Sequence, residues 1–263
     1  MRKTHLCAAL AMLLLPILAA AQSPFDGTWK WQVDKVDWSK KPDVYLLQNG
    51  MYQCKTCVPP IDVKADGTDQ AISGDPYSDT IAIKVINDHE IEITRKKGGK
   101  VVGTIKDVVS SDGNTMAFEF SDSSNTNGAP VTGKGEETRV AKGPAGSNAI
   151  SGSWRMAKME NMSDNGVVWT FKVNGDELTM TSPTGQSYTA KMDGTEAPMK
   201  GDPGITTVSV KKLGKDTIEE TDKRDGKLVA VVKSTVTPDG KTMHIVYEDK
   251  QTGQTSRSVA VKQ

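Results

Sequence analysis

Two cysteines close together in the sequence are the most reactive pair in the chain. Cys54 and Cys57 lie in the segment Cys54-Lys-Thr-Cys57, and the third cysteine, Cys7, lies near the N-terminus. A pair with this spacing can form a disulfide, carry out thiol–disulfide exchange or supply two ligands to a zinc ion. These three chemistries need different surroundings, so the neighbouring residues help to distinguish among them.

The residues after the pair favour a structural disulfide. An extended strand holds the Cα atoms of residues i and i+3 about 10 Å apart, beyond the roughly 7 Å limit for a bridge, so a bridge requires a tight turn. Val58-Pro59-Pro60 follows directly. It ends any strand and denies the pair the helix N-terminus that lowers the pKa of a redox-active thiol. We therefore predict a Cys54–Cys57 disulfide, with redox chemistry as an alternative.

Other chemistry finds little support in the sequence. A zinc site at the cysteines would need two further ligands, and after the N-terminal segment the chain offers only His89 and His244 besides carboxylates. A metal site shared between chains remains a minor alternative. The motifs of serine hydrolases, nucleotide-binding proteins and zinc peptidases are absent from the sequence. The 33 basic residues balance the 33 acidic ones. We therefore expect no catalytic residues, no cofactor and no nucleic-acid partner.

The N-terminal segment has the features of a secretory signal peptide. Arg2 and Lys3 precede an apolar stretch from Leu6 to Leu18, and Ala19-Ala20-Ala21 supplies an Ala-x-Ala cleavage site. The apolar stretch is too short for a stable transmembrane anchor, and no later segment is sufficiently apolar. We predict that residues 1–21 are removed near Ala21, leaving an exported protein, periplasmic or secreted, without a transmembrane anchor.

The rest of the chain consists of two copies of one unit. Gly74-Asp75-Pro76 matches Gly201-Asp202-Pro203, and further segments match in the same register: Asp66-Gly67-Thr68 with Asp193-Gly194-Thr195, Ile91-Glu92-x-Thr94 with Ile218-Glu219-x-Thr221, and Asp112-Gly113 with Asp239-Gly240. Small and flexible residues at 143–148 predict a linker between the copies. We expect a first domain at 24–142 and a second at 149–263, each able to fold alone.

Within each copy, apolar side chains alternate with a period of two. Met116, Phe118 and Phe120 share one face of a predicted strand, and Met243, Ile245 and Tyr247 repeat the pattern. Turn pairs such as Asn49-Gly50 separate the strands at short intervals, and no segment shows convincing helical periodicity. The sequence therefore predicts an all-β fold of two tandem small antiparallel up-and-down β-barrels, or β-sandwiches if the barrels do not close.

Each copy begins with a Gly-x-Trp strand and has an arginine in its last strand. These residues are Trp29 and Arg139 in the first copy, and Trp154 and Arg257 in the second. The pattern resembles that of lipocalins and other calycins, and the duplicated unit is similar to exported lipocalin-like proteins of bacteria. The resemblance implies that each Trp closes one end of a barrel while the arginine packs across it. Cation–π attraction would favour that contact.

Two classes of function fit these expectations. The first is an exported, non-catalytic binding module that holds a small apolar or amphipathic molecule in a barrel, since a barrel of about eight strands can enclose one small ligand. The second is a structural or interaction protein of the cell envelope, whose barrels are filled by their own side chains. A Cys-x-x-Cys redox protein is a third, weaker class. The volume of any cavity in the barrels separates the first two classes.

Overall fold

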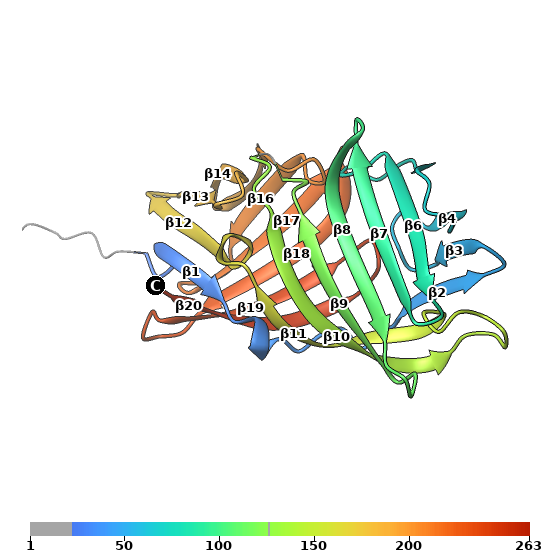
Figure 1. Cartoon of the computed structure of the whole chain (residues 1–263). Helices are drawn as coiled ribbons and strands as arrows, with labels where there is room; N and C mark the ends of the chain where they lie inside the picture. The colour runs from blue at the N-terminus through green and yellow to red at the C-terminus, as the bar shows by residue number, and fades with distance from the viewer. Residues whose placement is uncertain (1–22, 126) are drawn as a thin grey trace, which may run out of the picture.

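The computed structural model describes residues 23–125 and 127–263, and the predicted signal peptide lies outside the described residues. Strands dominate this part of the chain. Its short helical segments are the 3-10 helix η1 (Val33–Lys35) and the single-turn helix α1 (Asp164–Val167). The strands form two nearly closed, ten-stranded antiparallel barrels, seen on the right and left of Figure 1. The predicted all-β fold with two barrels is therefore confirmed.

The first barrel is a continuous stretch of the chain. Its strands are β2 (Asp43–Gln48), β3 (Met51–Cys54), β4 (Ile61–Lys64), β5 (Gln70–Ala71), β6 (Thr80–Asn87), β7 (Glu90–Lys97), β8 (Lys100–Val109), β9 (Thr115–Asp122), β10 (Val131–Lys142) and β11 (Gly152–Met162). They pair in the order β4-β3-β2-β11-β10-β9-β8-β7-β6-β5. Strand β11 thus closes the sheet by lying between β10 and β2.

The second barrel combines the C-terminal part of the chain with the first strand. Its strands are β1 (Gly27–Trp31), β12 (Val168–Asn174), β13 (Glu177–Thr181), β14 (Ser187–Lys191), β15 (Asp193–Pro198), β16 (Thr207–Lys212), β17 (Thr217–Arg224), β18 (Lys227–Val236), β19 (Thr242–Asp249) and β20 (Thr255–Lys262). They pair in the order β14-β13-β12-β1-β20-β19-β18-β17-β16-β15. Figure 1 shows the blue β1 beside the yellow β12 and the red β20.

The two repeats exchange their first strands. Strand β1 opens the first repeat but lies in the second barrel, and β11 opens the second repeat but pairs with β10 and β2 of the first barrel. The expected division at 24–142 and 149–263 is therefore corrected. Residues 143–148, predicted as a linker between domains, lie in the connection of the β10–β11 hairpin, because a short connection joins antiparallel neighbours in one sheet.

Each barrel has its own apolar core. The core of the first barrel includes Trp154 and Ile93, and the core of the second includes Trp29, Phe171 and Met243. Both tryptophans have 0% exposure. The strand exchange therefore also places each buried tryptophan in the barrel of the other repeat.

The turns follow the predicted chemistry. Asn49 and Gly50 both have positive φ, at 54° and 74°, as do Asp225 and Gly226 at 50° and 78°. Two successive positive φ values match the right-handed twist of the flanking strands, and only Gly, Asn and Asp adopt them readily. Among residues 23–125 and 127–263, no helix is long and apolar enough to span a membrane.

Candidate functional site

A cavity of about 770 Å³ is lined by residues of both barrels. The first barrel contributes one end of its sheet, including Ile105 on β8 and Phe120 on β9. The second barrel contributes inward-facing residues of β17 to β19, including Ile218, Val232 and Ile245. The volume lies within the range of small-molecule sites, which is roughly 300–1,000 Å³. Because both barrels form its wall, the cavity depends on how the two halves are joined.

About half of the residues that line the cavity are polar, but most of its surface is apolar. Besides Phe120 and Ile245, the apolar side chains include Met180, Met199 and Ile205 of the second barrel. Methionine side chains are flexible and adapt to ligands of different shapes, although they also fill gaps in ordinary cores. The wall therefore suits the apolar part of a small molecule.

A pair of buried carboxyl groups lies on β17. Strand alternation places Ile218, Glu220 and Asp222 on the inward face, and Ile218 and Glu220 line the cavity. The hydroxyl of Tyr188 donates a hydrogen bond to Glu220, and Asp222 lies beside Glu220 on the same face of the strand. Desolvation raises the pKa of both groups, that of Asp222 to about 9. The pair therefore holds at least one proton at neutral pH.

One contact between the repeated loops closes part of the cavity wall. The Tyr77 hydroxyl donates a hydrogen bond to Asp202 Oδ1 at 2.8 Å, and the Gly204 backbone N–H donates to the same oxygen at 2.7 Å. Tyr77 and Gly204 follow the matched Gly-Asp-Pro segments, so they occupy equivalent positions in the two repeats. Any side chain at Gly204 would collide with the Tyr77 ring. The equivalent loops therefore meet each other through an unequal pair of residues.

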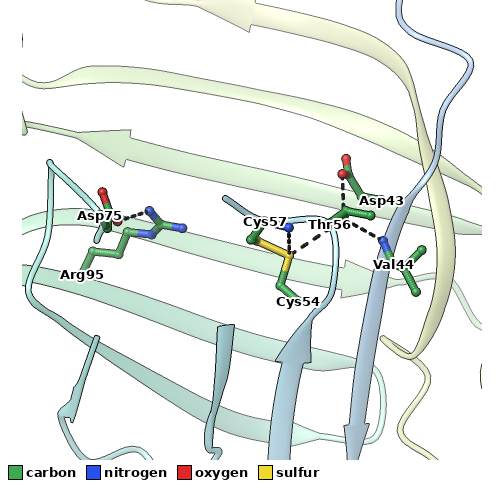
Figure 2. Close-up of a disulfide and its surroundings, with 7 residues drawn as sticks. All are labelled: Asp43, Val44, Cys54, Thr56, Cys57, Asp75 and Arg95. Carbon is green, nitrogen blue, oxygen red and sulfur yellow. Dashed lines mark hydrogen bonds and ion pairs between the residues drawn. A yellow bond between two sulfur atoms is a disulfide. The ribbon is translucent and has the colours of Figure 1, made fainter. Parts of the chain in front are cut away.

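Arg95, the basic residue in the cavity wall, forms an ion pair with Asp75. Arg95 Nη1 lies 3.2 Å from Asp75 Oδ2, and Arg95 also borders a second cavity of about 400 Å³ near the cysteines. Figure 2 shows this ion pair on one side and the cysteines on the other.

The predicted Cys54–Cys57 disulfide is confirmed. A turn after β3 brings the two Cα atoms to 5.4 Å, within bridging distance. In Figure 2 the backbone N–H of Cys57 donates to Cys54 Sγ at 3.1 Å, and Thr56 Oγ1 donates to Asp43 Oδ1 at 3.0 Å. The Thr56 hydroxyl also accepts a hydrogen bond from the Val44 N–H. The bridge therefore fixes a turn that is also tied to strand β2.

A cation packs against the buried tryptophan in each barrel, but both pairings differ from the prediction, which placed Arg139 with Trp29 and Arg257 with Trp154. The guanidinium of Arg139 lies 3.9 Å from the Trp154 ring centre and donates to the carbonyl groups of Gly113, Ala149 and Ser151. In the second barrel, Lys262 Nζ lies 4.9 Å from the ring centre of Trp29.

The prediction of Arg257 as the partner of a tryptophan is wrong. Its side chain is exposed and its backbone bridges to Asp37. The β19–β20 connection (residues 250–254) is shorter than the β9–β10 connection (residues 123–130), which shifts the register of the last strand. Lys262 consequently takes the place that Arg139 occupies in the first barrel.

The sequence interpretation missed the buried carboxyl groups. Besides Glu220 and Asp222, burial raises the pKa of Asp107 to about 7 and that of Glu137 to about 8 inside the first barrel. The alternation of side chains along the strand could have revealed the buried position of Glu137, because it shares the inward face of β10 with Gly133 and Gly135. Buried carboxyl groups therefore occur inside both barrels.

Comparisons with known proteins add no functional information. No protein-family model matches the sequence, and no curated protein matches it significantly. Within residues 23–125 and 127–263, no group of three or more His, Cys, Asp or Glu side chains is arranged to hold a metal ion. The candidate site is therefore the shared cavity of a two-barrel β protein.

Proposed function

We propose that this protein binds a small apolar or amphipathic molecule in the cavity that the two barrels share. The volume of about 770 Å³ carries the proposal. A space of this size exceeds the few small voids of a densely packed protein interior. A mostly apolar wall with a few polar groups is the usual composition of a small-molecule site.

We also propose that the protein acts outside the cytoplasm. The Cys54–Cys57 bridge supports this location, because disulfides persist in oxidising compartments such as the periplasm or the extracellular space. The sequence of residues 1–21, which has the features of a signal peptide, also supports it. In this setting the protein would carry or sequester its ligand without chemical change, as expected for an exported lipocalin-like protein.

The binding proposal is tested with a fluorescent apolar probe and a cavity-filling variant. N-phenyl-1-naphthylamine is uncharged at neutral pH and fluoresces strongly in apolar surroundings. We expect saturable binding of one probe per chain. Ile245→Trp should weaken binding at least tenfold, because Ile245 lines the cavity. His244→Trp is the matched control: His244 is the next residue on β19, is exposed and faces the opposite side of the sheet.

Two outcomes would reject the cavity as a binding site. Absence of saturable probe binding would favour the structural or interaction class instead. Equal weakening by Ile245→Trp and His244→Trp would place the probe elsewhere on the protein. Native mass spectrometry of protein purified from its own host gives an independent readout, because a retained small molecule would identify the ligand class.

A further inference from the structure

The two carboxyl groups on β17 specify what kind of ligand the cavity suits. Glu220 lines the cavity, and Asp222 lies next to it on the same inward face with only 4% of its surface exposed. Asp222 Oδ1 has no hydrogen-bond partner among the described residues. A buried carboxyl oxygen without a partner destabilises the protein unless something else satisfies it.

The duplication provides an internal comparison for this pair. The matched segments align Glu220 with Ile93 and Asp222 with Arg95 in the first repeat. Ile93 is 6% exposed and belongs to the core of the first barrel. The barrel therefore folds with an apolar residue at the position of Glu220. Since the fold does not require a carboxyl group there, the pair calls for an explanation in terms of binding.

The charges around the pair point to a positively charged partner. The titratable groups that face it are Tyr188 on β14, Asp202 in the loop before β16, and Tyr247 on β19. All three are phenols or acids, so none neutralises a carboxylate. The basic residue on the cavity wall, Arg95, is paired with Asp75.

We propose that the ligand is a cationic amphiphile, with a protonated amine that binds the Glu220–Asp222 pair and an apolar body that fills the shared cavity. This inference rests on the proposed function. The ammonium group donates a hydrogen bond to the Glu220 carboxylate, which lines the cavity, and the neighbouring Asp222 adds a second acidic group beside it. Such charge-assisted hydrogen bonds are stronger than those between neutral groups. The ligand cation replaces the proton that the carboxyl pair holds in the empty protein, and this proton passes to the solvent.

The test compares three ligands that share one apolar chain and differ in their polar group. Decylammonium, decanol and decanoate each compete with N-phenyl-1-naphthylamine at neutral pH. We expect decylammonium to displace the probe at a concentration at least tenfold lower than decanol, and decanoate to be the weakest competitor. Calorimetry in two buffers with different ionisation enthalpies should detect the release of a proton when decylammonium binds.

Two variants test whether the carboxyl pair causes the preference for decylammonium. Glu220→Gln keeps the size of the side chain but removes its charge. In this variant, decylammonium and decanol should displace the probe at nearly equal concentrations, so the ratio of these concentrations should be close to one. Glu219→Gln is the matched control, because Glu219 lies on the opposite face of β17 and should leave that ratio unchanged. Asp222→Asn serves as a second variant if Glu220→Gln does not fold, and should reduce the ratio at least threefold.

The outcomes separate this inference from the proposed function. If the probe binds in the cavity but decanol or decanoate competes as well as decylammonium, the cationic ligand is rejected and the binding function stands. The same holds if Glu220→Gln retains the preference for decylammonium. If the probe itself does not bind in the cavity, the proposed function fails together with this inference.

Discussion

Removing the N-terminal strand should unfold one barrel and leave the other intact. A chain that begins at residue 43 keeps every strand of the first barrel but lacks β1, which lies between β12 and β20. It also lacks Phe25 and Trp29, which are 1% and 0% exposed in the core of the second barrel. Truncating one buried aromatic residue typically costs about 3 to 5 kcal/mol, so losing both removes about 6 to 10 kcal/mol. This is comparable to the whole stability of a typical protein.

The assay is NMR of the shortened chain with and without a peptide of residues 23–42. We expect dispersed amide signals from the first barrel only, and recovery of the second set when the peptide is added. A fragment of residues 149–263 should need the same peptide to form the second barrel. Point variants provide a milder test. Trp29→Ala should lower the free energy of unfolding by about 3 to 5 kcal/mol, and Trp31→Ala should lower it considerably less because Trp31 is partly exposed. If the shortened chain keeps both barrels and melts like the parent, the strand exchange is refuted.

Three further changes have expected outcomes that follow from the geometry. Replacing Cys54 and Cys57 with Ser should leave the fold intact and lower the stability by about 1 to 2 kcal/mol, because the closed loop is very short; denaturant unfolding measures this change. Glu137 alone should lower the free energy of unfolding by about 3 kcal/mol between pH 5 and pH 8, because burial raises its pKa to about 8 and the unfolded chain loses this proton first as the pH rises; Asp107 and Asp222 act in the same direction. In the Glu137→Gln variant, the free energy of unfolding should depend less steeply on pH. A pH dependence as steep as that of the parent protein would contradict the raised pKa of Glu137. Arg139→Ala should cost about 2 to 3 kcal/mol in thermal or denaturant unfolding because it leaves carbonyl groups without donors, whereas Arg257→Ala should cost close to nothing.

Local patterns predicted much of the fold because they act between neighbouring residues. The period-two alternation and the turn pairs indicated barrels, and the residues around Cys54 and Cys57 indicated a turn closed by a disulfide. The strand exchange was out of reach of this reasoning. Gly27-Thr-Trp29 and Gly152-Ser-Trp154 are nearly the same, so the local sequence does not specify which barrel each strand joins.

The functional features depend on contacts that are distant in sequence. The shared cavity arises only when both barrels are placed together, and no single segment encodes it. The strand exchange places Arg139 beside Trp154 instead of Trp29. A shorter hairpin also shifts the last strand, so that Lys262, not Arg257, is the second cation and lies beside Trp29. Glu220 and Asp222 were within reach, since they alternate with the buried Ile218, but carboxyl groups on strands are ordinarily assumed to face water.

The loop contact between Tyr77 and Gly204 has a consequence for the history of the duplication. The exchange of β1 and β11 has the form of a symmetric dimer of a single-repeat ancestor, in which both loops would carry the same residue. A tyrosine on both sides would collide, because the ring already occupies the space beside Gly204. The present pair therefore arose after the two copies were joined in one chain. The halves have since become complementary parts that are no longer interchangeable, and a chain made of two first copies would not assemble in this way.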